Sequence, residues 1–562
     1  MRAWFGLALL SLAACNSSPS VPGPDVPLVS GEVTIQKTEW GQSVLKTGLR
    51  LVAGKPALLR VYMTADREGL PGHLKAEVFR GSNRLGELSF TGPATLPTAI
   101  NPADLAQTYR ATLPAAWVIA GMEVRLLADP SNQIGENNEA DNRLTLTPAV
   151  GVGTVLPLTL VPVLQPGQTA PPTLPSVDLL RDMLPLQGVQ TSTRPPFSYG
   201  ATVGNASSDW SNLLGALRSL RTSDGSSRYY YGVVRVGYTS GIAGIGYVGL
   251  PVSAGWDFAS SAARIMVHEI GHNLGRGHAP CNVAGESGYP YPGGFIGTWG
   301  YSVASSALFN PAQYKDVMSY CAPQWISDYM YEGMQSFLEH QSGLAQWAEI
   351  RSASSGLAPV GLEANPSTAQ LQNLRLAQEV LLVSGRIRGG EVILNPMVKM
   401  QAVPEAPQPG TYRLRLEAAG GLVEVSFRTE RVEAPHGPDQ PPDESWSEEH
   451  FSLLLPDPGP LRQIEVVREG LSLYRRDLRL TRQSTDNPAV RLTESGSSLT
   501  LTWMPSVFSY ASVAHLGQAR TTLALWLTGG EAHLSTVGLP SGGRWEIALS
   551  DGFNTQRLEF AR

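Results

Sequence analysis

The sequence predicts a multidomain protein of α/β plus β class, with an α/β domain in the middle of the chain and β-sandwich domains on both sides. The chain has 562 residues, which is more than one hydrophobic core serves, so we expect several domains. Only 16% of the residues are charged, whereas 58 are glycine and 43 are proline, a balance typical of β-rich domains joined by turns. Between residues 151 and 355, strand-like and helix-like stretches alternate, which favours an α/β sheet.

The first fifteen residues, MRAWFGLALLSLAAC, predict a secretory signal peptide. One arginine precedes an apolar run that ends in small residues and is too short to span a bilayer. The ending LAAC resembles the lipobox of bacterial lipoproteins, which implies cleavage before Cys15 and lipidation of Cys15. The expected location is the cell envelope, with the exported protein anchored by lipid at the outer membrane or cell surface. A plain signal peptide cut nearby is the alternative.

Residues 16–29 are rich in serine and proline and predict a semi-extended tether. Residues 30–150 predict a β-sandwich, because short strand-like stretches such as KPALLRVYM and MEVRLLAD lie between turn residues. The stretch IGENNEADNRLTLTP predicts a turn between two strands. It resembles the acidic turn of bacterial CARDB-type adhesion domains, which implies an immunoglobulin-like sandwich. We interpret its carboxylates as a solvated turn, with a calcium site as the alternative.

Residues 151–355 supply the elements of the α/β domain. The apolar run VGTVLPLTLVPVL predicts a strand that is covered on both faces. Four leucines share one face of a predicted helix, and Gly225 follows as its stop; the leucines are Leu213, Leu214, Leu217 and Leu220. The stretches RYYYGVVRVGY and GIAGIGYVGLP predict two further strands, and ISDYMYEGMQSFLEHQ predicts the last helix of the domain.

The stretch HEIGHNLGRGH, residues 268–278, predicts a zinc site. On a helix, His268 and His272 lie one turn apart on the same face, so both imidazoles can reach one ion. Glu269 points in another direction and can contact a water on the ion instead. Gly275 can adopt a positive φ and turn the chain, which brings His278 back as a third ligand. Three protein ligands leave a fourth position for water, as in catalytic zinc sites.

The pattern HExxHxxGxxH is the signature of metzincin peptidases. That family also has a methionine in a tight turn beneath the metal, and the stretch KDVMSYCAP places Met318 there. Tyr320 matches a tyrosine that astacins and serralysins carry near the metal. The stretch AGIGYVGLP lies where the family's edge strand pairs with an extended substrate. The resemblance therefore implies that residues 151–355 form a metzincin-like catalytic domain.

The resemblance implies a zinc-dependent endopeptidase. The zinc ion would lower the pKa of its water, Glu269 would take the proton and pass it to the leaving amine, and zinc with Tyr320 would stabilise the oxyanion. The stretches HNLGRGHAPC and YPYPGGFIGTWGY are similar to the secreted mucin-cleaving metzincins of enteric bacteria, which implies extracellular proteins, and glycoproteins among them, as substrates. Two alternatives stay open: a surface adhesin or glycan-binding lipoprotein with a non-catalytic metal site, and a zinc hydrolase of other bonds.

Cys281 and Cys321 are the two cysteines other than Cys15. In an exported protein we expect them to form a disulfide, which would tie the segment after His278 to the segment after Met318. Two free buried thiols are the alternative.

The C-terminal part predicts two β-sandwiches, residues 356–455 and 456–562, with a boundary near LPDPGP, and it shows no catalytic motif. Nucleic-acid binding has no electrostatic support, because the net charge is −6 and no Lys/Arg cluster stands out. Outside the motif, the histidines are scattered along the chain: His73, His340, His436, His450, His515 and His533.

Overall fold

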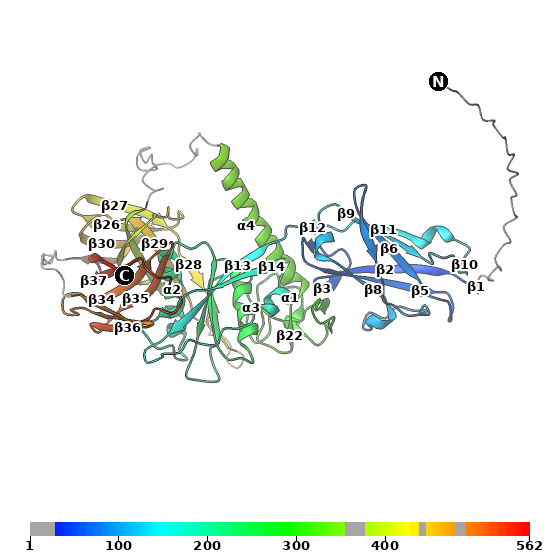
Figure 1. Cartoon of the computed structure of the whole chain (residues 1–562), viewed down its shortest axis with the longest axis horizontal. Coiled ribbons are helices and arrows are strands. Elements are labelled where there is room, and N and C mark those ends of the chain that lie inside the picture. Colours follow the sequence, from blue (N-terminus) through cyan, green and yellow to red (C-terminus); the bar gives the residue numbers. More distant parts are fainter. Residues whose placement is uncertain (1–28, 355–376, 438–445, 479–489) are drawn as a thin grey trace, which may run out of the picture.

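The computed structural model describes residues 29–354, 377–437, 446–478 and 490–562. The predicted signal peptide, the lipobox with Cys15 and all but the last residue of the tether lie outside these ranges. The described chain is mostly β-sheet with few helices, and β-sandwich units flank a larger central sheet (Figure 1). None of the helices in these ranges is long and apolar enough to cross a membrane.

The N-terminal region is a β-sandwich. A four-stranded sheet in the order β11-β9-β6-β7 and a six-stranded sheet in the order β20-β19-β3-β2-β5-β8 share one hydrophobic core. Two short parallel pairs, β1 with β10 and β4 with β12, lie beside them. The strands are β1 (Val29–Ser30), β2 (Val33–Gly41), β3 (Ser43–Lys46), β4 (Leu51–Val52), β5 (Ala57–Ala65), β6 (Leu74–Arg80), β7 (Asn83–Leu88), β8 (Tyr109–Leu113), β9 (Met122–Ala128), β10 (Ile134–Gly135), β11 (Arg143–Leu146), β12 (Val150–Gly151), β19 (Trp299–Tyr301) and β20 (Leu308–Phe309).

Two strands of that six-stranded sheet come from the middle of the chain. The strand β19 pairs with β3 through Gly300 and Val44, and β20 pairs with β19. Trp325 adds a side-chain contact, because its indole Nε1 donates a hydrogen bond to the carbonyl of Ser43 over 2.7 Å. The N-terminal sandwich and the middle region are therefore joined by a continuous sheet.

The part of the central sheet that residues 151–355 form consists mainly of parallel strands. Strands β14, β15 and β16 run parallel to β13, β18 runs parallel to β16, and β17 is an antiparallel edge strand. At its other side, β15 meets β35 of the C-terminal region, so the whole sheet has ten strands. The strands are β13 (Val155–Leu164), β14 (Gly188–Thr193), β15 (Phe197–Ser198), β16 (Tyr229–Val234), β17 (Gly244–Gly246) and β18 (Val252–Trp256).

Helices cover both faces of this sheet. Alternate residues of β13 belong to different cores: Leu158 packs in the cluster of α3 (Ala262–Asn273), and Val161 packs in the cluster of α2 (Ser207–Ser223). The leucines predicted on one face of α2 are fully buried. This region also contains the helices α1 (Asp178–Met183) and α4 (Asp328–Ser354) and the short pair β21 (Lys315–Asp316) and β22 (Gln324–Trp325).

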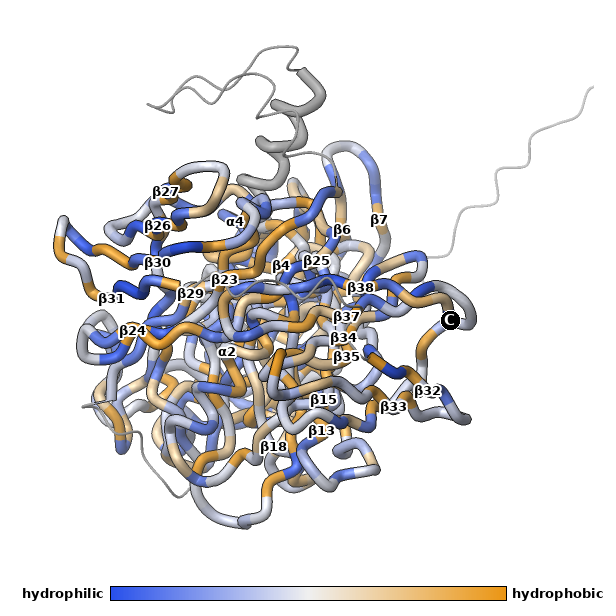
Figure 2. Tube along the Cα trace, turned by 90° about the vertical axis from the view of Figure 1, so that its left-hand side faces the viewer, coloured by the Kyte–Doolittle hydropathy of each residue, from blue (hydrophilic) through white to orange (hydrophobic). Residues whose placement is uncertain are grey.

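The C-terminal part contains two further β units. In the first, the sheets β24-β23-β29-β28, with β25 beside β23, and β27-β26-β30-β31 share a core. Blue and orange alternate along strands such as β26 (Figure 2), in step with its alternating burial. The strands are β23 (Gln378–Arg388), β24 (Glu391–Leu394), β25 (Val398–Ala402), β26 (Tyr412–Ala418), β27 (Gly421–Phe427), β28 (Glu430–Val432), β29 (Glu448–Pro456), β30 (Leu461–Arg468) and β31 (Leu471–Asp477).

The second unit packs the sheet β32-β33-β36 against strands β34, β35, β37 and β38 of the ten-stranded sheet. Its strands are β32 (Arg491–Ser495), β33 (Ser498–Thr502), β34 (Tyr510–Leu516), β35 (Arg520–Leu527), β36 (Glu531–Ser535), β37 (Arg544–Ser550) and β38 (Thr555–Ala561).

The domain boundary expected near residues 455–460 requires correction. Strand β26 pairs with β30 through Leu414 and Val466, across that position, and residues from both sides share one core. The stretch PDPGP is therefore a turn inside the first unit, because its prolines and glycine end β29 and let the chain cross to the other sheet.

Candidate metal centre

Helix α3 carries the first half of the predicted site. Its residues favour a helix, with no glycine or proline before Gly271. The helix ends at Asn273, and Gly275 with a φ of +81° then reverses the chain. His268 and His272 lie one turn apart on the same face, and their Nε2 atoms are 3.1 Å apart.

The proton positions on these two imidazoles favour a cation between them. The Nδ1 of His268 lies 2.7 Å from the carbonyl of Val317, and the Nδ1 of His272 lies 2.8 Å from the carbonyl of Arg276. A carbonyl only accepts, so both Nδ1 atoms carry the proton. Burial lowers the pKa of both rings, which favours the neutral form. Two Nε2 lone pairs therefore face each other at 3.1 Å, close to the ~3.3 Å that two ligands of a tetrahedral zinc ion require.

His278 completes the predicted set. Its ring centroid lies 4.7 Å from that of His272 and 5.5 Å from that of His268. The hydroxyl oxygen of Tyr320 lies 2.6 Å from the Nε2 of His278, within hydrogen-bond distance. Burial, and then the charge of Glu269, raises the pKa of Tyr320, so the phenol keeps its proton and remains a donor. The structure thus brings together the three predicted ligands and the predicted tyrosine.

The turn around Met318 contacts the segments that carry His268 and His278. Met318 is fully buried in the same core as α3, and its carbonyl accepts from the backbone of Ala279, directly after His278. The preceding carbonyl, of Val317, orients His268. Asp316 holds the turn by accepting from the backbone N–H of Met318 over 2.7 Å. Outer contacts of this kind fix the orientation of metal-binding histidines.

The predicted disulfide is confirmed. Cys281 and Cys321 are bonded, with their Cα atoms 5.8 Å apart. The backbone N–H of Tyr320 also donates to the carbonyl of Cys281 over 3.2 Å. The bond therefore ties the segment that carries His278 to the segment that carries Tyr320.

Glu269 is a fully buried carboxylate, and neither of its oxygens has a hydrogen-bond partner among the described residues. Burial, and then the nearby charge of Glu433, raises its pKa well above the usual range. Glycine in the edge strand β17 makes room for it, because a side chain at Gly244 would overlap its Oε1. An unpartnered buried carboxylate next to converging imidazoles is costly unless a cation or water completes it.

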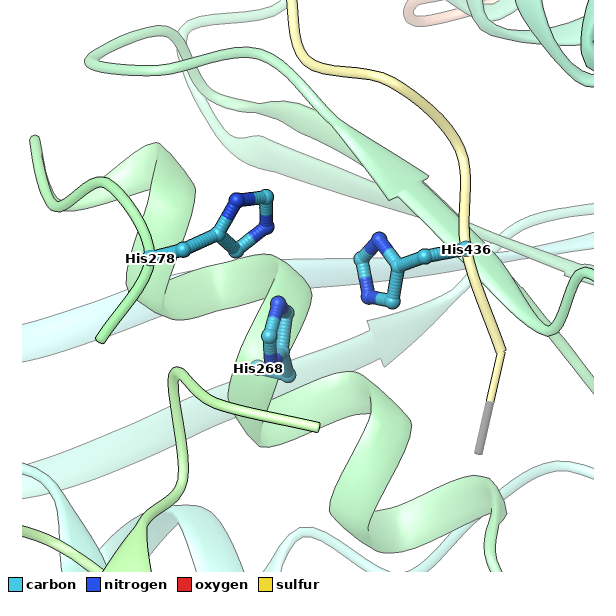
Figure 3. A group of neighbouring side chains, drawn as sticks. All are labelled: His268, His278 and His436. Atoms are coloured by element: carbon cyan, nitrogen blue, oxygen red, sulfur yellow. The ribbon is translucent and has the colours of Figure 1, made fainter. Parts of the chain in front are cut away.

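His436 is the member of the site that the sequence did not predict. It belongs to the segment that follows β28, and its ring faces the same space as His268 and His278 (Figure 3). One ligand atom from each of these three histidines lies within 4.8 Å of the other two. No spacing rule could connect His436 to the motif, because the two are far apart in the sequence and meet only through the docking of β28.

A second buried polar cluster lies nearby but lacks the geometry of a catalytic triad. The Nε2 of His450 contacts both Ser211, at 2.9 Å, and Glu448, at 2.8 Å. The Nδ1 of His450 lies 2.5 Å from the hydroxyl of Tyr247. The serine and the carboxylate share one ring nitrogen, so no proton can pass through the ring from one to the other. The cluster joins α2 to β29 and thereby fixes the C-terminal part against the middle region.

A cavity of about 170 Å³ opens beside the centre, and His268, Tyr320 and His436 are among the residues that line it. The histidines are the neutral nitrogen donors that zinc accepts. Burial, and then the other imidazoles, lowers the pKa of His278 and of His436. The donor set therefore fits a zinc ion.

Comparisons with known proteins do not place the chain in a family. No family model and no curated protein matches it. A segment of two fibronectin type III domains from chicken tenascin is 14% identical, covers 33% of this chain and 99% of that chain, and has a TM-score of 0.13. A β-glucuronidase of Parabacteroides merdae is 9% identical, covers 95% of this chain and 77% of that chain, and has a TM-score of 0.13. At these TM-scores neither likeness carries an argument about function.

Proposed function

We propose that this protein is a zinc endopeptidase of the metzincin type. One observation carries the proposal: the unprotonated Nε2 atoms of His268 and His272 face each other at 3.1 Å beside the unpartnered carboxylate of Glu269. His268, His272 and His278 would hold the ion. Bound there, zinc would act as a Lewis acid on a water and on the scissile carbonyl.

The side chains around the ion have separate roles in this proposal. Glu269 takes a proton from the attacking water and delivers it to the leaving amine. Tyr320 keeps its phenolic proton and can donate a hydrogen bond to the developing oxyanion. An extended peptide would pair with the backbone of the edge strand β17, which contacts the segment of His436 in this structure.

The substrate and the location are also proposals. Extracellular proteins, with glycoproteins among them, are the expected substrates. Lipid on Cys15, which lies outside the described residues, would anchor the enzyme at the outer membrane or cell surface. Both follow from the resemblances in the sequence.

A second candidate is a surface adhesin or glycan-binding lipoprotein whose metal site is not catalytic. His436 favours it, because a fourth histidine near the ion would give a closed site, and closed zinc sites are structural.

The test compares residues 16–562 with their Glu269→Gln variant on casein and on mucin. We expect cleavage that a chelator stops and zinc restores, and a loss of at least about 100-fold in the variant, because general-base catalysis contributes that much. The variant should retain zinc, since Glu269 is not a ligand. Equal cleavage by the two proteins would refute the role of Glu269. If no variant cleaves any protein, including variants that lack His436, the second candidate replaces the first.

A further inference from the structure

The segment that carries His436 lies along the outer edge of the central sheet. Strand β17 is the last strand of that sheet, and isolated antiparallel bridges pair Gly244 with His436 and Tyr247 with Val432. The N–H of Ala243 donates to the carbonyl of His436 over 2.6 Å, and the N–H of His436 donates to the carbonyl of Gly244 over 3.3 Å. The segment thus makes the backbone contacts that an extended peptide would make on an open edge strand.

The same backbone position directs the His436 side chain into the metal centre. Its ring centroid lies 4.4 Å from that of His268 and 4.5 Å from that of Tyr320. Its Nε2 lies 3.2 Å from the Oε1 of Glu269, but the pair lacks hydrogen-bond geometry, and neither atom has a hydrogen-bond partner in the described parts of the chain. A cation bound between these side chains would satisfy both buried atoms.

Packing against the C-terminal part of the chain fixes the segment that carries His436 on β17. Strand β28 pairs with β29 through Val432 and Glu448, and Val432 is buried in the core of α2. Glu430 forms an ion pair of 3.4 Å with Arg218 of α2, and both side chains are largely buried. Because strand pairing, apolar packing and a charge pair all hold β28, the position of His436 follows from the docking of the whole C-terminal part.

We propose that His436 is a fourth protein ligand of the ion, and that residues 432–437 occupy the peptide-binding edge of β17, so that the chain folds into a latent state. The inference rests on the proposed function, because it needs an ion at His268, His272 and His278. Bringing the ligand atoms of His268, His278 and His436 from within 4.8 Å to tetrahedral spacing takes a contraction of at most about 1.5 Å. Substrate then reaches Glu269 only after residues 432–437 leave β17.

The first test measures the coordination of the bound metal ion and does not depend on catalytic activity. Residues 16–562 are loaded with Co²⁺, whose visible spectrum reports coordination number, and titrated with acetohydroxamate, which binds an open position. We expect the wild-type spectrum to be insensitive to acetohydroxamate. The variants His436→Ala and His436→Phe should respond to it, and their zinc affinity should fall by at least about tenfold, since even residues that only support a ligand contribute this much. His436→Phe keeps the ring volume in case the alanine variant does not fold.

The matched control is His533→Ala, because His533 is an exposed histidine of β36, far along the chain from the motif. It should behave as wild type. A wild-type spectrum that responds to acetohydroxamate as the His436 variants do would overturn the fourth ligand.

The second test reads peptide cleavage. A closed state that leaves 0.1–10% of the molecules competent predicts that His436→Ala cleaves casein about 10- to 1000-fold faster than wild type. Wild type that cleaves as fast as His436→Ala, while Glu269→Gln is inactive, would overturn latency and leave the peptidase intact. If His436 changes the Co²⁺ spectrum and no variant cleaves protein, both latency and the peptidase proposal fail, and the centre is a non-catalytic metal site.

Discussion

Removing the disulfide between Cys281 and Cys321 should destabilise the metal centre by an amount that follows from its place in the sequence. The two residues are 40 apart. In the chain-entropy treatment, a cross-link of this loop length restricts the unfolded chain by about 4 kcal/mol at 25 °C. The double variant Cys281→Ser/Cys321→Ser should lose this amount. For a region of 150–250 residues, about 4 kcal/mol corresponds to a fall in Tm of roughly 8–16 °C.

The assay is calorimetry of residues 16–562 with and without zinc. The transition that belongs to the metal-binding region is identified as the one that zinc raises, because a ligand that binds only the folded state stabilises it. The fall in Tm is then measured on that transition in the double variant. A zinc titration adds a second measurement. We expect weaker binding, because His278 lies just before Cys281, and Tyr320, which contacts His278, lies just before Cys321.

The reasoning would be refuted if that transition moved by less than the 2–4 °C expected for about 1 kcal/mol. Such a result would mean that the hydrogen bonds between the two segments already restrict them without the covalent bond. Wild-type protein treated with a reductant provides the control, since it should match the double variant in both measurements.

Two further predictions concern single residues. Gly275→Ala should lower the free energy of unfolding by more than the ~1–2 kcal/mol of a left-handed alanine, because its Cβ would lie 2.8 Å from the ring of Phe337. The variant should also bind zinc more weakly in a titration. The control is Gly225→Ala, which has a similar positive φ and open space around it, so it should lose only the backbone strain energy and bind zinc as wild type does. Burial lowers the pKa of Lys55 from 10.5 to about 7. Between these two pH values the unfolded chain binds one more proton than the folded chain does. The free energy of unfolding should therefore rise as the pH goes from about 7 to 10.5, by at most roughly 5 kcal/mol. Lys55→Met should lack that rise in urea titrations at several pH values, and an equal rise in the variant would assign the pH dependence to other groups.

The local parts of the site could be predicted from the sequence. The spacing of His268 and His272 equals one helical turn, and Gly275 marks the bend, so three candidate ligands follow from a few consecutive residues. The disulfide follows from the count of cysteines in a chain whose sequence predicts export. In each case the information lies in short stretches, where the backbone geometry is nearly fixed.

The long-range parts could not be predicted in this way. His436 reaches the centre only because β28 pairs with β29 and its continuation lies on β17, and no periodicity in the sequence records such a pairing. The pairing of β3 with β19 could not be predicted for the same reason. The sequence predicts a domain boundary at PDPGP where the structure has a turn, because a turn within a sandwich and a linker between sandwiches have the same composition.

The pairing of β3 with β19 gives the N-terminal sandwich a role in the folding of the middle region. Strand β19 lies between His278 and Met318 in sequence, and its partner β3 is synthesised long before it. On the ribosome the sandwich can therefore serve as a template that receives β19 when it emerges. A gene truncated to begin at residue 151 would encode a chain without this template, with the indole of Trp325 and the backbone of β19 deprived of their acceptors. Screens for a minimal folded fragment that contains the candidate metal centre should begin at residue 29 or before.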